Sequence, residues 1–386
     1  MPKSLAHPAF ELGQLDLSDG AVQSRLDDIR AQKLALNVLN RPLVLVGAGS
    51  LLAQEFVSHM ISLGHVIALV DNARAGQIYM DVPFIGDSAV SDVLAKAPHA
   101  IGVLCCASEN AIAHFTRVWG ERPHPLISYF EVVTLLPDAN AAGRHLGFLP
   151  EFSDVAQICA LHEKAKGIFA DILSRRTLDA LMLYRLTWDM TFIAQINKPE
   201  KAIYFEPDVM PLGDHEILVD GGAYDGDTAR DFVSKTGGRY DHIHSFEIDP
   251  QNADWFATKT ASIERLSLHR IGLWNEQAEI GIDQRIESSS RVNHQSQLKV
   301  PLDAMDNMDL GPVSLIKLDI EGAEVQALNG ARKLIQAHKP KLAICTYHRP
   351  NDFDTIPATL CDIRDDFTLR LRHYSPILFD SVIYAV

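Results

Sequence analysis

One loop of the sequence combines carboxylates with glycines, the residue types that hold a small cationic ligand. The apolar run at 217–219 predicts a buried parallel strand, and the residues after it predict a tight turn opening a helix. Three carboxylates in this loop would repel the pyrophosphate that such turns bind in dinucleotide sites. A ligand with an ammonium, a sulfonium and no phosphate fits better, and S-adenosylmethionine is such a ligand. The alternative is a solvated loop with helix-capping aspartates. The predicted cofactor contacts here are Asp220, Gly221, Gly222, Tyr224, Asp225, Gly226, Asp227 and Thr228.

A second acidic position follows the next predicted strand. The segment 242–246 is typical of a strand, and it ends at Glu247. A carboxylate at the end of the second strand can accept hydrogen bonds from both ribose hydroxyls of a cofactor. Asp249 follows Glu247, and a third predicted strand, 266–273, leads to a loop expected over an adenine ring. The cofactor contacts predicted from these segments are Glu247, Asp249, Gly272 and Leu273.

The fourth predicted strand, 313–318, leads to the residues expected to do the chemistry. We expect Asp319 to face the reacting groups and to contact the cofactor, because it follows this strand at the carboxyl edge of the sheet. We expect Glu321 to position an acceptor hydroxyl. The alternative is that Glu321 and Glu324 match the charge of a helix N-terminus.

Transfer to a hydroxyl also needs a group that takes its proton. His348 follows a predicted fifth strand at 342–345, and a neutral imidazole there is suited to act as a general base near pH 7. His373 is the second candidate base. Asp352 and Asp354 lie near His348 in the sequence, but no metal site is predicted from them. The predicted catalytic residues are therefore His348, Asp319 and Glu321.

These motifs occur in an order that resembles a known family. The sequence contains VDGGAYDGDT at 219–228, FEIDP at 246–250, KLDIEGAE at 317–324 and CTYHRPNDF at 345–353. Together they resemble the FkbM family of S-adenosylmethionine-dependent methyltransferases, from Glu216 to the C-terminus. The resemblance implies a class I methyltransferase fold and methyl transfer to an oxygen, typically a hydroxyl of a sugar, glycan or secondary metabolite. Gly221 departs from the family, many of whose members carry a larger apolar residue there.

The hydrophobic periodicity of the residues before 213 predicts further elements ahead of the methyltransferase-like part. We predict an α/β protein with two Rossmann-like doubly wound domains joined by a helical segment. Residues 1–40 are expected to form a helical arm, 41–150 a Rossmann-like domain, 151–212 a helical bridge and 213–386 the methyltransferase domain. Prolines and glycines between 123 and 150 indicate the exit from the first domain.

The first Rossmann-like domain has its own glycine turn. The segment 43–46 predicts a strand followed by Gly47 and Gly49, with Ala53 at the third small position. The next strand, 66–70, ends at Asp71, which is suited to bind a ribose hydroxyl. The segment resembles the N-terminal nucleotide-binding domain of some sugar acyltransferases, including a turn at 82–87. A bound nucleotide and a role in packing or assembly both stay open.

The composition of the chain limits which partners and which cellular location are expected. The chain has 386 residues, 47% of them hydrophobic, and a formal net charge of −15, which argues against nucleic acid and anionic membranes as partners. Its first ten residues lack the apolar core of a signal peptide, and no apolar run is long enough to span a bilayer. With five cysteines and no C-x-x-C pair, we expect reduced thiols and a cytoplasmic location.

The sequence therefore favours an O-methyltransferase whose partner is a small-molecule or glycan hydroxyl acceptor. A first alternative is a non-catalytic regulatory protein that binds a nucleotide or sugar nucleotide. A second is an NAD-dependent oxidoreductase, although no paired catalytic residues occur near Gly47 to Asp71. The sequence leaves open whether the chain forms a homo-oligomer.

Overall fold

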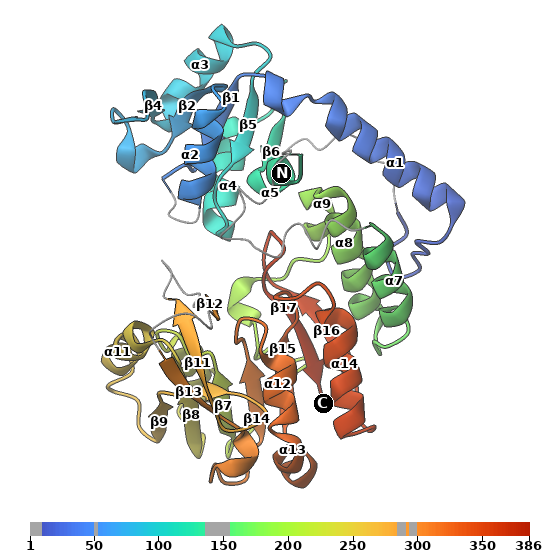
Figure 1. Ribbon diagram of the computed structural model, residues 1–386, viewed down its shortest axis with the longest axis vertical. Coiled ribbons are helices and arrows are strands. Elements are labelled where there is room, and N and C mark those ends of the chain that lie inside the picture. The colour runs from blue at the N-terminus through green and yellow to red at the C-terminus, as the bar shows by residue number, and fades with distance from the viewer. Residues whose placement is uncertain (1–9, 50–52, 136–154, 284–290, 293–298) are drawn as a thin grey trace. The chain divides into compact units, whose positions relative to one another are not determined.

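The computed structural model describes residues 10–49, 53–135, 155–283, 291–292 and 299–386, and the chain divides into two compact units (Figure 1). The first unit comprises Met1–Lys166, Arg175–Asn197 and Ser375–Leu378. The second comprises Gly167–Ser174, Lys198–Tyr374 and Phe379–Val386. Each unit has its own largely parallel sheet, so the predicted fold class, α/β with two Rossmann-like units, is confirmed.

The sheet of the first unit has the strand order of a dinucleotide-binding fold. Its order is β3-β4-β2-β1-β5-β6, with β3 antiparallel to β4 and the other neighbours parallel. Without the edge strand β3, this is the doubly wound order 3-2-1-4-5. The strands are β1 (Leu43–Val46), β2 (Val66–Val70), β3 (Ile78–Tyr79), β4 (Val82–Ile85), β5 (Ile101–Leu104) and β6 (Leu126–Ser128).

Helices separate these strands and continue the chain beyond them. Within the segment predicted as a helical bridge, helices occur between residues 155 and 193. The helices up to residue 193 are α1 (Gly20–Ala35), α2 (Gln54–Ser62), α3 (Val90–Lys96), α4 (Glu109–Trp119), α5 (Tyr129–Leu135), α7 (Val155–Ala165), α8 (Ile172–Thr187) and α9 (Met190–Ile193). Short 3-10 turns occur at Val38–Asn40, Asn72–Arg74, Asp87–Ala89, Glu200–Ala202 and Met305–Asn307.

Two sequence-based expectations for the first unit are wrong in detail. The segment 82–87 is not a turn throughout, because Val82–Ile85 forms β4, with Val82 and Phe84 buried and Pro83 exposed. That alternation is the period-two pattern of a strand with one buried face. The segment 123–150 is also more than an exit, since β6 extends the sheet and α5 follows it directly. The proline-rich composition hid both elements.

In the main sheet of the second unit, the order in which successive strands are added reverses between β7 and β14. Its order is β16-β17-β15-β14-β7-β8-β9, with β17 antiparallel to both neighbours and the rest parallel. Ligands of open α/β sheets bind outside the carboxyl ends of the strands where the order reverses, here β7 and β14. The strands are β7 (Ile217–Gly221), β8 (His242–Phe246), β9 (Leu266–His269), β14 (Leu315–Leu318), β15 (Lys341–Cys345), β16 (Leu369–His373) and β17 (Ser381–Ala385).

A second, smaller sheet and further helices complete the described part of this unit. The segment 266–273 was predicted as one strand, but it divides into β9 and a two-residue strand of the smaller sheet, β10 (Gly272–Leu273), which pairs with β13. The smaller sheet also contains β11 (Ala278–Asp283), β12 (Arg291–Val292) and β13 (Lys299–Asp303). The helices are α10 (Asp227–Thr236), α11 (Pro250–Lys259), α12 (Glu324–Asn329), α13 (Arg332–His338) and α14 (Asp352–Ile363).

Apolar side chains of the main sheet and its helices form a buried core. Leu218, Phe232, Ile243 and Phe256 belong to one cluster, and each of these four side chains is fully buried. Most of the serine-rich stretch at 284–301 lies outside the described residues. In the part of the chain that the structure describes, no helix is both long and apolar enough to cross a bilayer.

Candidate functional site

The ends of β7 and β14 lie side by side and place two predicted site residues next to each other. Gly221 pairs with Leu318 in the parallel register, and the Asp319 amide donates to the Gly221 carbonyl at 3.1 Å. Gly222 follows with φ +77°, and a Cβ there would overlap the Asp319 carbonyl oxygen. Only glycine allows the loop to pass so close to Asp319, which explains the residue type at this position.

The amides of this loop are used inside the protein. Gly222 and Ala223 both donate to the Phe246 carbonyl at 3.0 Å, and Tyr224 donates to Glu247 Oε2 at 2.8 Å. Gly226 donates to the Ala223 carbonyl at 2.8 Å. A pyrophosphate site needs such amides to point at the ligand. The hydrogen bonding therefore agrees with the expectation of a ligand without phosphate.

A buried lysine holds the loop to the fourth strand. Lys317 Nζ lies 3.0 Å from Asp220 Oδ1 and donates to the carbonyls of Gly221 and Gly222 at 3.2 and 2.8 Å. Burial lowers the pKa of Lys317, but Asp220 and Asp319 outweigh burial and raise it above its usual value, so the ammonium stays charged. Lys317 therefore stabilises the end of β14 by pairing with an acid.

The three loop aspartates differ in their surroundings. Asp225 pairs with Arg230 at 3.1 Å and with Lys259, so its charge is neutralised within the protein. Asp220 is fully buried against Lys317, and Asp227 is exposed at the start of α10. Asp225 and Asp220 are therefore both paired with cationic side chains, and of the three aspartates Asp227 alone is exposed. Gly226 and Thr228 flank it, and Thr228 is buried.

Glu247 lies beside the same loop. Its Oε2 accepts from the Tyr224 amide and its Oε1 from the Asp249 amide, each at 2.8 Å. Burial raises the pKa of Glu247, and these two hydrogen bonds oppose the increase. Each carboxylate oxygen has two lone pairs, so each can accept one more hydrogen bond. Asp249 caps α11 by accepting from the amides of Gln251 and Asn252.

The two residues predicted to lie beside the adenine ring, Gly272 and Leu273, form a short strand of the smaller sheet. This strand is β10, and Leu273 is buried. A Cβ on Gly221 would lie 3.0 Å from Leu273 Cδ1, so these two residues are close in space. Trp255 of α11 adds an exposed indole, edge-on to the Tyr224 ring at 6.3 Å. Trp255 was not among the predicted site residues.

Asp319 receives two hydrogen bonds from tyrosines that the sequence did not identify. Tyr204 donates to Oδ2 at 2.8 Å and Tyr347 donates to Oδ1 at 3.0 Å. Burial raises the pKa of Asp319, but His348, Lys317 and the two tyrosines outweigh burial and hold it below its usual value. Asp319 is therefore an ionised carboxylate whose orientation is fixed from both sides.

His348 lies among three carboxylates. Its Nδ1 is 3.0 Å from Glu324 Oε1, and its Nε2 is 3.4 Å from Asp319 Oδ1 and 3.9 Å from Glu321 Oε2. Burial lowers the pKa of His348, but these carboxylates raise it to about 10. The expectation of a neutral imidazole near pH 7 is therefore wrong for this arrangement, because the ring is an imidazolium at that pH.

Glu321 and Glu324 have different surroundings although they are close in sequence. Glu324 is buried and accepts from the amides of Ile320 and Gly322 at 2.9 and 3.3 Å, which holds the loop after β14. The Glu321 side chain is 47% exposed and its backbone has φ +56°. Partial burial raises the pKa of Glu321, the His348 charge opposes that increase, and the exposure limits it. The Asp319 side chain is 23% exposed.

The other acidic and basic candidates lie elsewhere in the second unit. His373 is buried in β16 with its Nδ1 2.8 Å from Ser381 Oγ, so it contacts the neighbouring strand β17. Asp352 begins α14 and accepts from the Arg349 amide at 2.7 Å. Asp354 lies in the first turn of α14. Within the described ranges, no three histidine, cysteine or acidic side chains are arranged to hold a metal ion.

Sequence reasoning missed Tyr204, Tyr347, Glu324 as a partner of His348, and Trp255. Tyr347 precedes His348, so its position after β15 was a usable signal. Tyr204 lies before β7 in an irregular segment, with φ +64°, and no sequence pattern connects it to Asp319.

Comparison with known proteins agrees with this geometry. Residues 220–372 match the family model described as the Methyltransferase FkbM domain. No curated protein matches the sequence. The crystal structure of a methyltransferase FkbM from Methylobacillus flagellatus KT aligns with a TM-score of 0.65 and 23% identity, covering 93% of this chain and 98% of that chain. Its similarity shows a shared fold over both units.

Two further structures align over less than half of this chain. An rRNA methylase from Streptococcus thermophilus has a TM-score of 0.30 and 16% identity, covering 45% of this chain and 87% of that one. A fibrillarin from Aeropyrum pernix, solved with natively bound S-adenosyl-L-methionine, has a TM-score of 0.31 and 15% identity. The alignment covers 48% of this chain and 71% of that one.

Proposed function

We propose, from the premise that residues 220–372 form a methyltransferase domain of the FkbM family, that the chain methylates a hydroxyl oxygen of a sugar, a glycan or a secondary metabolite. The methyl donor is S-adenosylmethionine. When bound, it supplies an electrophilic methyl group on a sulfonium. The rest of the chemistry is the work of the protein: holding the donor, orienting the acceptor and receiving the hydroxyl proton.

The loop after β7 and Glu247 are suited to hold the donor. Gly222 has no side chain and so leaves space beside Asp319, which we call the Gly222 cradle. The amides of Gly222, Ala223, Tyr224 and Gly226 donate within the protein, which disfavours a phosphate ligand. We assign the ribose hydroxyls to Glu247, whose two oxygens each keep one lone pair. Asp220, Gly221, Tyr224 to Thr228, Asp249, Gly272 and Leu273 complete the proposed cofactor site.

Glu321 is the best placed of the acidic residues to receive the proton. Asp319 already accepts two tyrosine hydroxyls, and Glu324 is buried against His348 and two amides. Glu321 accepts no hydrogen bond from any residue in the described ranges, and its side chain is about half exposed. We therefore assign proton acceptance to Glu321 in place of His348.

His348 and Asp319 act on this carboxylate and on the acceptor in different ways. The imidazolium of His348 lies 3.9 Å from Glu321 and is suited to orient it and to stabilise its charge. Asp319 is suited to accept a hydrogen bond from the acceptor or from the donor's ammonium, at the carboxyl end of β14. The observation that carries the proposal is the convergence of Asp319, Glu321 and His348 beside the Gly222 cradle.

The direct test offers methyl-labelled S-adenosylmethionine to the full chain with hydroxyl, amine and carboxyl acceptors. We expect label only in hydroxyl products, from the sugar or polyol class. Glu321→Gln should lower kcat about a hundredfold, within the ~10²–10⁴-fold typical of acid–base groups, with unchanged donor affinity. The matched control is Glu276→Ala, an exposed carboxylate after β10. Label in amines alone, or full activity of Glu321→Gln, would contradict the assignment.

A further inference from the structure

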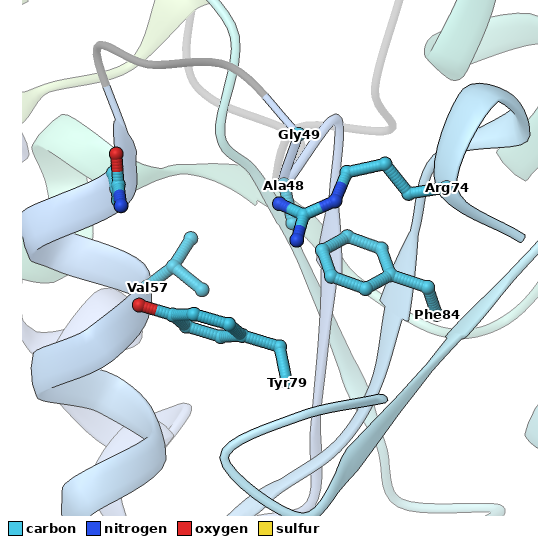
Figure 2. Close-up of a pocket in the computed structure, with 7 residues that line it drawn as sticks. Ala48, Gly49, Val57, Arg74, Tyr79 and Phe84 are labelled. Atoms are coloured by element: carbon cyan, nitrogen blue, oxygen red, sulfur yellow. The ribbon is translucent and has the colours of Figure 1, made fainter. Parts of the chain in front are cut away.

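We propose that the first unit binds the ribonucleoside diphosphate part of a nucleotide, in a cavity separate from the methyl-transfer site. The cavity measures about 200 Å³. Figure 2 shows Arg74, Tyr79, Phe84 and Val57 around it, together with Ala48 and Gly49 from the turn after β1. Gln54 of α2 completes the lining. The cavity therefore adjoins the glycine turn after β1, where doubly wound sheets of this order bind nucleotides.

Arg74 gives the cavity a positive charge. Its guanidinium carbon lies 4.1 Å from the centre of the Phe84 ring and 5.7 Å from that of Tyr79, so two aromatic rings hold it in place. Its Nε donates to Gln77 Oε1 at 3.1 Å. No carboxylate among the described residues forms an ion pair with it. A held guanidinium without a counter-ion is suited to bind phosphate through its remaining N–H groups.

Asp71 adds a carboxylate at the end of β2. Its Oδ1 accepts from the Ala73 amide at 2.9 Å, and a Cβ on Gly49 would lie 2.7 Å from its Cγ. Asp71 therefore contacts the cavity wall at a position that only glycine leaves open. A carboxylate at the end of the second strand accepts from the ribose 2′-hydroxyl and repels a 2′-phosphate. The structure thus favours a ribonucleotide with a free 2′-hydroxyl.

Size and charge distinguish this cavity from the site in the second unit. Whole small-molecule sites typically measure ~300–1,000 Å³, so a cavity of about 200 Å³ is expected to hold one part of a ligand. Arg74 would repel the ammonium and sulfonium of a methyl donor. The loop after β7, with satisfied amides and the exposed Asp227, would in turn disfavour a diphosphate. The two units are therefore suited to ligands of opposite charge.

Calorimetry on the full chain tests the proposal. ADP, UDP and NAD are titrated in the presence of saturating S-adenosylmethionine, so that the second unit is occupied, and NADP and 2′-deoxy-ADP serve as probes of the 2′ position. We expect at least one ribonucleotide to bind, and NADP and 2′-deoxy-ADP to bind more weakly than NAD and ADP. Arg74→Ala should weaken binding about tenfold or more. Arg117→Ala, an exposed arginine of α4, should not.

Two further variants examine Asp71. Asp71→Asn should reduce the difference in binding affinity between ADP and 2′-deoxy-ADP. Gly49→Ala should displace Asp71 and weaken binding, whereas Gly20→Ala, whose Cβ would meet nothing within 4 Å, should leave it unchanged. Thermal unfolding and circular dichroism verify that every variant is folded, independently of methyl transfer.

Three results would overturn the proposal. The first is no binding of ADP, UDP or NAD by the wild-type chain at millimolar concentration. The second is binding that survives unchanged in both Arg74→Ala and Asp71→Asn. The third is nucleotide binding that is lost in Glu247→Ala, since that would place the ligand in the second unit. None of these results depends on whether the second unit transfers methyl groups.

Discussion

The backbone of Gly222 passes so close to Asp319 that a Cβ at residue 222 would lie 2.9 Å from the Asp319 carbonyl carbon and closer still to its oxygen. Gly222→Ala must therefore move either the loop after β7 or the turn after β14. We expect the variant to remain folded but to lose measurable affinity for S-adenosylmethionine in calorimetry, because both proposed cofactor contacts shift together.

Gly238 provides a control with nearly the same backbone conformation. Its φ is +76° against +77° for Gly222, and a Cβ there would meet nothing within 4 Å. In both variants, an alanine in the left-handed conformation costs ~1–2 kcal/mol, so only the steric clash at residue 222 distinguishes them. Equal cofactor affinities in Gly222→Ala and Gly238→Ala would contradict a role of the Gly222 cradle in binding.

Glu247 and Asp220 are expected to affect cofactor affinity by different routes. Glu247→Ala removes the acceptor of two amides and the proposed ribose contact, so affinity for S-adenosylmethionine should fall at least tenfold. Asp220→Ala leaves Lys317 buried without its ion-pair partner, which should also lower the free energy of unfolding by ~3–5 kcal/mol.

Asp220→Asn also removes the charge that pairs with Lys317 but keeps the side-chain volume, so comparison with Asp220→Ala separates the loss of the ion pair from the loss of packing. Calorimetry and denaturant unfolding are measured on each variant, with the exposed Asp208→Ala as the control. Unchanged affinity in both Glu247→Ala and Asp220→Asn would refute the proposed position of the cofactor.

The protonated state of His348 predicts how stability depends on pH. Its pKa is about 10 in the folded protein against 6.5 as the ordinary value, so the folded state binds the proton more tightly. The stabilisation is complete below about pH 6.5 and is lost as the pH increases toward 10, by on the order of a few kcal/mol. In denaturant unfolding between pH 6 and 10, the wild type should lose stability that His348→Asn does not lose.

The control is His338→Asn, an exposed histidine at the end of α13. This variant should follow the wild-type curve. If His348→Asn also follows that curve, His348 is not an imidazolium in the folded protein. In addition, His348→Ala should keep the cofactor affinity and lower methyl transfer, because Glu321 loses the charge that orients it.

The two tyrosines on Asp319 predict a shift in the pH profile of methyl transfer. Each hydroxyl helps to hold the pKa of Asp319 low, so removing one raises that pKa. The acid limb of kcat should therefore move to higher pH in Tyr204→Phe and in Tyr347→Phe. In Tyr240→Phe, whose hydroxyl donates to the Glu264 carbonyl, the acid limb should stay in place. Identical acid limbs in all three variants would mean that a group other than Asp319, such as Glu321, sets the acid limb.

Strand ends were predictable because they depend on local patterns. Apolar runs ending in an acid located Asp220, Glu247 and Asp319 at the carboxyl edge of one sheet, and that placement is confirmed. Once the strands are parallel neighbours, the residues after them must lie together. Their grouping required no knowledge of side-chain contacts.

Protonation states and distant partners were not predictable in the same way. The charge of His348 depends on Glu324 and Asp319, and the pKa of Asp319 depends in part on Tyr204, 115 residues away in the chain. No local pattern connects Asp225 with Lys259, which lies 34 residues later and pairs with it. Such pairings arise only when separate elements pack.

The division of the chain has a practical consequence for making fragments of this protein. The second unit includes Gly167–Ser174, and in that segment Asp171 pairs with Arg372 at 3.0 Å while Ser174 accepts from the Leu371 amide at 2.9 Å. A truncated gene starting at residue 198 would therefore encode β16 with a buried arginine that has lost Asp171, the nearer of its two carboxylate partners. Expression of the second unit alone calls for a start before residue 167 or a permuted gene that reconnects this segment.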